Sequence, residues 1–256
     1  MSIIAFVPVR SGSKSIIDKN IKEFYGKPLV YWILKALQNA TEINEVVIAL
    51  DSEKYAEIVK TFSFSKVKIY MRNPENAVDT ASTESVMLEY LSVAKPCEDD
   101  VFILAQATSP LTSSEDFNSA IRQYFYSGKD SLLSCVKTKR FFWNNDGTSL
   151  NYDFNNRPRR QDFDGVFMEN GAFYINKVKN ILVNKNRLSG SIDIFEMPEY
   201  TSLELDEPTD WKIGEILMAE RFKPSKPNSI KLLLSDVDGV LTDGGMYYTE
   251  KGDEIK

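Results

Sequence analysis

Short apolar runs alternate with amphipathic segments along most of this 256-residue chain, and this alternation is the strongest constraint on its fold. Continuously apolar runs predict strands buried on both faces, which occur in parallel sheets covered by helices. The expected strands are residues 3–9, 46–50, 67–70, 101–105, 131–136, 171–175 and 202–205. The expected helices begin near Pro28, follow a cap at Asp51-Ser52, and span residues 83–93, 117–126 and 208–222. The predicted fold class is α/β with a doubly wound, mostly parallel sheet, and ligands are expected at the carboxyl ends of its strands.

The sequence contains no histidine. This absence excludes Ser-His-Asp and Cys-His nucleophile systems, His-ligated zinc and every general base built on imidazole. Chemistry in this chain must therefore use carboxylates, lysine, arginine, hydroxyls, backbone amides or a metal bound by oxygen ligands.

Charge, cysteine content and the apolar runs bear on partners and compartment. A net charge of −6 argues against a nucleic-acid partner, which usually requires a basic surplus. Cys97 and Cys135 are too few and too far apart for a disulfide framework and favour reduced thiols. Residues 3–9 lack a cationic leader, and no run approaches the roughly 18 apolar residues of a membrane span. We expect a cytoplasmic protein with no membrane and no nucleic-acid partner.

A polar loop at residues 10–20 (RSGSKSIIDKN) directly follows the first expected strand. Its small residues let backbone N–H groups approach an anion, and its cations offset the charge, as a phosphate-binding loop requires. The loop is not a Walker motif, because no Gly-Lys-Ser/Thr closes it, and it contains no GxGxxG. A solvated basic loop without a ligand is the alternative interpretation.

The functional interpretation of this loop becomes more specific when later blocks of sequence are considered with it. The blocks are VPVRSGSK at 7–14 with Lys19-Asn20, GKPL at 26–29, QATSPL at 106–111 and ENGAFY at 169–174. Together they resemble the sugar-activating cytidylyltransferases, and among these the CMP-N-acylneuraminate (sialic acid) synthetases, from about Ile3 to Arg221. The resemblance implies a nucleotide-diphospho-sugar transferase-like, Rossmann-like fold with a protruding dimerisation arm. It also implies transfer of CMP from CTP to a nine-carbon 2-keto sugar acid, with release of pyrophosphate.

The resemblance also implies roles for individual residues. Those implied to hold the triphosphate and ribose are Arg10, Ser11, Gly12, Ser13, Lys19 and Asn20, with Arg10 and Lys19 as the catalytic cations. Those that resemble cytosine contacts are Arg72 and Ser82, and Ser82 could equally be a helix N-cap. Those implied to bind the sugar are Gln106, Thr108, Ser109, Arg160, Gln161, Glu169 and Asn170. For 106–110 and for Asn170-Gly171 a plain turn is the alternative.

Residues 202–206 (SLELD) contain candidate ligands for Mg²⁺. The segment alternates polar and apolar residues, so a strand would place Glu204 and Asp206 on one face. Carboxylates at the mouth of a site suit an Mg²⁺ that keeps its waters and bridges phosphates. The family usually has Asp at both positions, so Asp206 is the firmer ligand and Glu204 is a departure. A polar strand end before the last helix is the alternative.

Residues 137–166 break the alternation and are rich in aromatic, basic and Asn residues. We interpret them as an arm that leaves the main sheet, and exposed aromatic side chains on it would need a partner surface. In the family this arm reaches the neighbouring subunit's site, which implies a homodimer and places Arg160 near the acceptor's carboxylate. The alternative is that the arm's arginines only keep it soluble.

Residues 223–229 (KPSKPNS) have the composition of a linker, and a second motif follows them. Residues 232–244 (LLLSDVDGVLTDG) resemble the first motif of haloacid-dehalogenase phosphatases, with Asp236 as nucleophile and Asp238 as general acid. The chain ends 28 residues after Asn228, below the roughly 40 residues that usually fold alone. We expect a cytidylyltransferase domain over 1–222, a linker over 223–229 and an incomplete, inactive phosphatase fragment over 230–256. A complete phosphatase domain would make a higher oligomer possible.

Two alternatives to the nine-carbon reaction stay open. The tail's likeness to the phosphatase of the eight-carbon (3-deoxy-octulosonate) pathway favours a CMP-3-deoxy-octulosonate synthetase, whereas Glu169-Asn170-Gly171 and the aromatic arm favour the nine-carbon class. Ser15, where the family usually has glycine, and Glu204 instead favour a non-catalytic scaffold that binds nucleotide or sugar.

Overall fold

The computed structural model describes residues 1–12, 15–78, 81–222, 235, 245 and 247–255. The chain divides into two units, Met1–Glu220 and Arg221–Lys256. The described elements of the second unit are the antiparallel strands β10 (Tyr247–Tyr248) and β11 (Glu254–Ile255). The expected linker 223–229 and the candidate residues Asp236 and Asp238 lie outside the described residues, so the phosphatase fragment stays a prediction.

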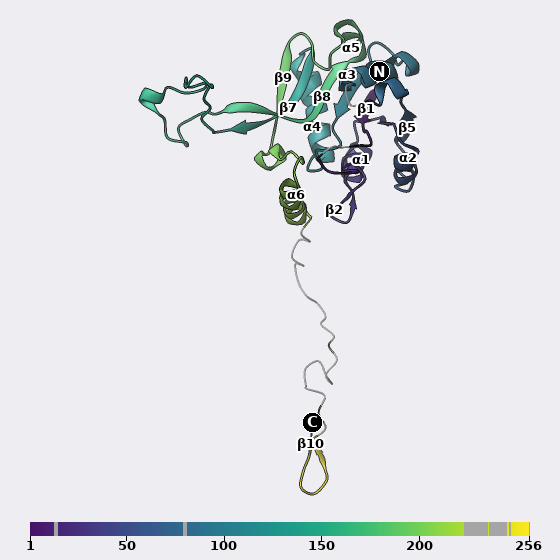
Figure 1. Ribbon diagram of the computed structural model, residues 1–256, viewed down its shortest axis with the longest axis vertical. Coiled ribbons are helices and arrows are strands. Elements are labelled where there is room, and N and C mark those ends of the chain that lie inside the picture. The colour runs from purple at the N-terminus through teal and green to yellow at the C-terminus, as the bar shows by residue number, and fades with distance from the viewer. Residues whose placement is uncertain (13–14, 79–80, 223–234, 236–244, 246, 256) are drawn as a thin grey trace. The chain divides into compact units, whose positions relative to one another are not determined.

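The first unit is built around a seven-stranded sheet with strand order β5-β4-β1-β6-β8-β7-β9 (Figure 1). Its strands are β1 (Ile3–Pro8), β4 (Glu45–Leu50), β5 (Val67–Met71), β6 (Val101–Ala105), β7 (Ser131–Thr138), β8 (Val166–Lys177) and β9 (Ile192–Met197). β8 runs antiparallel to both neighbours and the other pairings are parallel. The predicted mostly parallel α/β sheet is confirmed.

Helices cover both faces of this sheet because its central strands bury alternate residues on opposite sides. In β1, Ala5 and Val7 pack with α1 (Leu29–Asn39), α2 (Glu53–Lys60) and α4 (Ser114–Ser127). Ile4 and Phe6 pack with α3 (Thr83–Ala94) and α5 (Val178–Asn184) on the other face. This two-residue alternation is the period of a strand, and it makes the sheet the middle layer of three.

A third apolar cluster lies beside the main sheet. It joins the short strand β2 (Glu23–Phe24), which pairs with β3 (Lys27–Pro28), to the last helix, α6 (Pro208–Arg221). Short 3₁₀ helices occur at η1 (Pro74–Asn76), η2 (Phe154–Asn156) and η3 (Glu199–Ser202). No helix in the part of the chain that the structure describes is long and apolar enough to cross a membrane.

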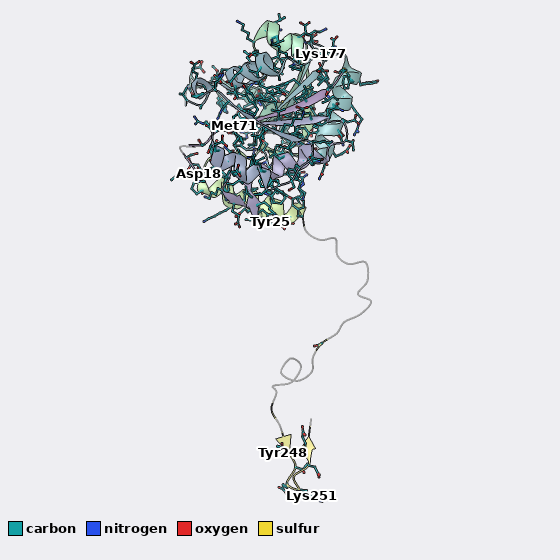
Figure 2. The ribbon with its side chains drawn as sticks, turned by 90° about the vertical axis from the view of Figure 1, so that its right-hand side faces the viewer. Asp18, Tyr25, Met71, Lys177, Tyr248 and Lys251 are labelled. Atoms are coloured by element: carbon teal, nitrogen blue, oxygen red, sulfur yellow. The ribbon has the colours of Figure 1, made fainter. Side chains whose placement is uncertain are left out.

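The order of winding changes between β1 and β6. From β1 the chain proceeds outward through β4 to β5, and then returns to β6 on the other side of β1. Ligands of open α/β sheets bind outside the carboxyl ends of the strands at such a switch point. Figure 2 shows Asp18, in the loop after β1, and Met71, at the end of β5, away from Lys177, where antiparallel β8 ends. The loops after β1 and β6 therefore share one edge of the sheet.

Two local predictions are wrong. Residues 203–206, predicted as part of a strand, follow η3 and belong to no described strand. Their alternation arises from packing on one side, because Leu205 is buried in the third cluster while Glu204 and Asp206 are exposed. Ser52 is the N-cap residue of α2 but its side chain makes no capping hydrogen bond, and Asp51 bonds elsewhere.

The region from β7 to β9 is more regular than the sequence predicted. β8 begins at Val166, and β9, for which no strand was predicted, pairs in parallel with β7. β7 and β8 continue as a ribbon that carries residues 139–165 away from the rest of the sheet (Figure 1). Aromatic rings pack together there, with Phe141 4.3 Å from Tyr152 and 5.0 Å from Phe163 between ring centroids. Dimerisation through this segment stays a prediction.

Candidate functional site

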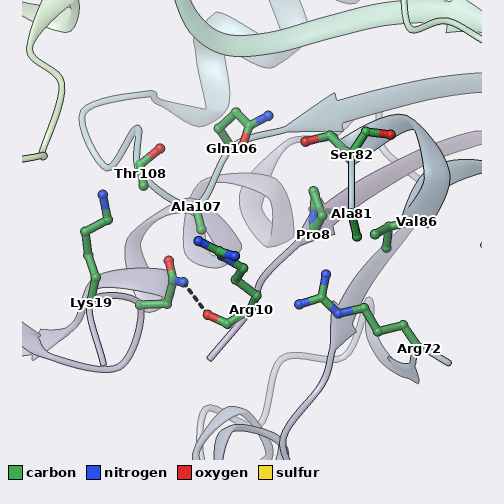
Figure 3. A pocket seen from close by; sticks show the side chains of 12 residues that line it. Pro8, Arg10, Lys19, Arg72, Ala81, Ser82, Val86, Gln106, Ala107 and Thr108 are labelled. Carbon is green, nitrogen blue, oxygen red and sulfur yellow. Dashed lines mark hydrogen bonds between the residues drawn. The ribbon is translucent and has the colours of Figure 1, made fainter. Parts of the chain in front are cut away.

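A cavity of about 280 Å³ opens beside the carboxyl ends of β1 and β6 (Figure 3). Its lining residues come from the loops after β1, β5 and β6 and from the start of α3: Pro8, Arg10, Lys19, Asn20, Arg72, Ala81, Ser82, Thr83, Val86, Gln106, Ala107 and Thr108. In Figure 3 the side chains of Arg10 and Arg72 lie on one side of the cavity, and those of Gln106 and Ser82 lie on the other. The structure thus brings together five residues predicted to bind nucleotide.

A second cavity, of about 210 Å³, adjoins the first. Its lining residues come from the loop after β6, the middle of β8 and the segment before α6: Gln106, Thr108, Ser109, Asn170, Gly171, Tyr174, Leu203, Glu204, Leu205 and Asp206. Gln106 and Thr108 line both cavities. Residues predicted for the sugar and for the metal therefore meet beside the predicted nucleotide site.

Arg72 is a buried, fixed cation in the wall of the first cavity. Its Nη2 donates to the carbonyl oxygen of Val9 and to Oδ2 of Asp51, each at 3.0 Å, and both charged side chains are 5% exposed. The other Asp51 oxygen, Oδ1, accepts a hydrogen bond from the backbone N–H of Ser11 at 2.8 Å. Nε of Arg72 is buried with no partner among the described residues. An unsatisfied buried donor in a cavity wall is a group that a ligand can satisfy.

Lys19 connects the two cavities. Its Nζ donates to the carbonyl oxygen of Leu205 at 2.9 Å and to Oδ1 of Asp206 at 3.1 Å. The neighbouring Asn20 donates from Nδ2 to the carbonyl oxygen of Arg10 at 3.0 Å, and its Oδ1 is buried without a partner in the described part of the chain. The loop after β1 thus places a charged donor, Lys19 Nζ, and an unused acceptor, Asn20 Oδ1, on residues that line the first cavity.

Glu204 and Asp206 are exposed at the edge of the second cavity, and Asp206 shares one oxygen with Lys19. Within the described ranges, no group of three or more His, Cys, Asp or Glu residues could hold a metal ion. A closed protein cage for a metal is therefore absent from that part of the molecule. The two carboxylates fit the other mode of Mg²⁺ binding, in which water and substrate phosphates complete the octahedron.

A bulge in β8 places Asn170 and Gly171 against the second cavity. β7 and β8 pair at Leu133 with Tyr174 and again at Cys135 with Glu169, so residues 170–173 lie opposite Ser134 alone. Gly171 has φ +65°, which glycine adopts without strain. The Asn170 Oδ1 accepts from Ser134 Oγ at 2.8 Å and its Nδ2 donates to Thr201 Oγ1 at 3.1 Å. Asn170 therefore lines the cavity while its amide bonds within the protein.

Several predicted residues line neither cavity. Ser11 and Gly12 stand in the loop after β1 without lining either cavity, and Ser13 lies outside the described residues. Arg160 lines a separate cavity with Lys137, Lys139, Glu196 and Glu199, and the neighbouring Gln161 is exposed. Glu169 is exposed and accepts a hydrogen bond from the Tyr174 hydroxyl. Their predicted ligand contacts stay predictions.

A model of the cytidylyltransferase family matches residues 4–226. The chain belongs to this family. It is 33% identical over 263 aligned positions to N-acylneuraminate cytidylyltransferase A of Danio rerio, covering 99% of this chain and 60% of that protein. It is 28% identical to the CMP-N,N'-diacetyllegionaminic acid synthase of Legionella pneumophila, covering 85% and 97% respectively. This cytidylyltransferase chain thus spans about 60% of the length of its fish relative.

A solved structure supports the fold of this cytidylyltransferase. CMP:2-keto-3-deoxy-manno-octonic acid synthetase complexed with CTP superposes with a TM-score of 0.63 at 18% identity, over 87% of this chain and all of that one. At this identity the likeness concerns the fold alone. The predicted nucleotide-diphospho-sugar transferase-like architecture is confirmed.

Sequence reasoning missed several residues that shape the site. The sequence around Asp51 predicts a helix cap, and it predicts no role of their own for Glu84, Tyr174 and Arg187. Ser82 is both the N-cap of α3, accepting from the Ser85 N–H at 3.0 Å, and a lining residue of the first cavity. The tyrosine lies within the ENGAFY block, which was the one available signal, whereas Glu84 and Arg187 carry no local motif.

Proposed function

We propose that this chain transfers CMP from CTP to a nine-carbon 2-keto sugar acid and releases pyrophosphate. The observation that carries the proposal is the pair of adjoining cavities that share Gln106 and Thr108. The first is lined by arginine and lysine side chains and suits a polyphosphate, whereas the second is lined by amide, hydroxyl and carboxylate groups and suits a polyhydroxylated acceptor. The relatives named for N-acylneuraminate and diacetyllegionaminic acid transfer support the acceptor class.

The chemistry requires little beyond positioning and charge neutralisation. The acceptor's anomeric hydroxyl oxygen attacks the α-phosphorus of CTP, a new P–O bond forms, and the bond to the bridging oxygen breaks as pyrophosphate leaves. The hydroxyl proton passes to bulk water, and the anomeric oxygen stays with the sugar. Arg10 and Lys19 would neutralise charge that develops on the leaving phosphates, and Arg72 would orient the nucleotide. None of these steps needs an imidazole.

Asp206 and Glu204 would hold a Mg²⁺ at the junction of the cavities. When bound, this ion would neutralise phosphate charge and align the polyphosphate. The ion pair with Asp206 holds Lys19 next to that position. Removal of divalent cations with EDTA should abolish pyrophosphate release, and added Mg²⁺ should restore it.

We also propose that the active form is a homodimer. Within one copy, Arg160 and Gln161 line neither cavity, and a second copy would bring them to an acceptor. Exposed rings such as Trp143, which is 50% exposed, suit a protein partner. Light scattering should give the mass of two chains, and a monomer that retains full activity would contradict the proposal.

The deciding experiment incubates the chain with CTP, Mg²⁺ and a panel of eight-carbon and nine-carbon 2-keto sugar acids while pyrophosphate is measured. Release with a nine-carbon acid alone supports the proposal, and preference for an eight-carbon acid favours the second candidate. CTP binding without turnover on any acceptor would contradict both and favour a binding scaffold. Lys19→Met should lower kcat/KM about 100-fold or more. The matched control is Lys60→Met, which removes an exposed lysine paired with Glu57.

A further inference from the structure

Arg187 contacts both Glu84 and Tyr174, which belong to elements that border the two cavities. It lies in the loop after α5, and its Nε donates to Oε1 of Glu84 at 2.6 Å. Its guanidinium lies over the ring of Tyr174, 4.8 Å from the ring centroid. The side chains of Arg187 and Glu84 are only 22% and 25% exposed, so water screens the ion pair less than a surface pair.

Glu84 lies next to residues of the first cavity, and Tyr174 lines the second. Glu84 is in the first turn of α3, directly after Ser82 and Thr83, which line the first cavity. Tyr174 lines the second cavity, and its hydroxyl donates a hydrogen bond to the carboxylate of Glu169. Neither Arg187 nor Glu84 lines either of these two cavities, so we expect any effect on a ligand there to act through their neighbours.

The chemistry of these groups favours one fixed arrangement. The hydrogen bond from Arg187 lowers the pKa of the Glu84 carboxyl, which keeps that anchor charged. Burial and the hydrogen bond to Glu169 raise the pKa of Tyr174, so its hydroxyl stays protonated and donates. A planar guanidinium can pair with a carboxylate and stack on an aromatic face at the same time, which a lysine ammonium does less well.

We propose that Arg187 is a positioning residue for acceptor binding: anchored on Glu84, it fixes the ring of Tyr174 in the wall of the second cavity and, through that ring, the carboxylate of Glu169, the chain neighbour of the lining residue Asn170. The inference rests on the proposed function, because it takes the second cavity as the acceptor site. Acceptor affinity should therefore depend on Arg187 although this residue lines neither of the two cavities.

The kinetic test uses Arg187→Met, which keeps most of the side-chain length and removes the charge. We expect the KM for the acceptor to rise about 10-fold, because small displacements of positioning groups weaken productive binding. The Kd of CTP, measured by calorimetry without acceptor, should change less than twofold. Arg187→Lys should restore part of the lost affinity. Arg122→Met is the matched control, because Arg122 is half exposed and pairs with Glu42 and Glu115 on the surface.

A second measurement needs no turnover. With ¹³C-labelled tyrosine and glutamate, relaxation of the Tyr174 ring and of the Glu169 carboxyl carbon reports how rigidly each is held, with assignments from Tyr174→Phe and Glu169→Gln. Arg187→Met should increase the mobility of both, including Glu169, for which the structure shows no direct contact with Arg187. A purely local stacking role would leave Glu169 unchanged.

The outcomes separate this inference from the proposed function. If no acceptor yields pyrophosphate with the unmodified chain, the proposed function fails and the relaxation experiment alone decides the role of Arg187. Unchanged acceptor KM, a parallel loss of CTP affinity, or unchanged Glu169 mobility in Arg187→Met would overturn the inference. Should Arg187→Met not fold, Glu84→Gln removes the charged anchor and takes its place in both measurements.

Discussion

Asp51 fixes both the Arg72 side chain and the start of the loop after β1, so its removal should cost stability as well as nucleotide binding. Asp51→Ala leaves the guanidinium of Arg72 with its hydrogen bond to Val9 and removes its ion-pair partner. It also leaves the backbone N–H of Ser11 without the acceptor it has at 2.8 Å. Two groups therefore lose a partner through one substitution.

The structure sets the size of this loss. Removing one partner of a buried ion pair costs about 3–5 kcal/mol, because the remaining charge stays in a poorly solvated place. Asp51 and Arg72 are both 5% exposed, which places them in this class. Arg72 nevertheless lines a cavity and keeps one acceptor, so water can replace part of the lost interaction. We expect a loss of about 3 kcal/mol in the free energy of unfolding.

Urea denaturation followed by circular dichroism measures this change. The control is Asp99→Ala, which removes an exposed pair with Lys179 and should cost at most about 1 kcal/mol. Calorimetry should also show CTP affinity reduced about tenfold, since Arg72 is no longer fixed and Ser11 no longer holds the loop. A loss of stability below about 1 kcal/mol would contradict this prediction, because it would mean that Arg72 is not held by its ion pair.

Three further predictions concern single groups. Ser82→Ala should lower the free energy of unfolding by about 1 kcal/mol in urea denaturation, because α3 loses its N-cap. Because the pKa of Glu84 is lowered in the folded protein, its pair with Arg187 stabilises the fold fully above the unfolded-state pKa of about 4.3. This stabilisation is lost as the pH falls through the folded-state pKa. Glu84→Gln should therefore make the free energy of unfolding depend less on pH in this acidic range. Burial raises the pKa of the Cys135 thiol to about 11, so at pH 8 a thiol reagent should label the exposed Cys97 alone in folded protein, and rapid labelling after Cys97→Ser would contradict this.

The strands that could be predicted from the sequence are those buried on both faces. β1, β4 and β6 are buried on both faces, so nearly every residue in them is apolar and the run is visible without an alignment. β9 lies at the sheet edge, where Ile192 and Ile194 are 45% and 38% exposed and polar residues intervene. A mixed edge strand has the local pattern of a loop, because its partner strand and not its own composition stabilises it.

The site could be predicted where a motif block directly follows a strand of the parallel sheet. Ligands are expected at the carboxyl ends of the strands, and the loops after β1 and β6 line one cavity there. Asp51 could not be recognised, because an acidic residue between a strand and a helix has the same local sequence as a cap. Arg187 was equally hidden, since its contacts with Glu84 and Tyr174 depend on how the loop after α5 folds over the sheet.

The candidate metal ligands show how a wrong local prediction can still give a correct neighbourhood. Residues 203–206 pair with no described strand, yet Asp206 reaches Lys19, far away in the sequence. Apolar packing explains the contact: Leu205 is buried, and Trp211 of α6 packs edge-on against Phe24 with ring centroids 5.1 Å apart. The third cluster thus holds the carboxylates beside the loop after β1. Because the polar face of 203–206 is set by the burial of Leu205, side-chain alternation survives without a strand, and only the backbone pairing was mispredicted.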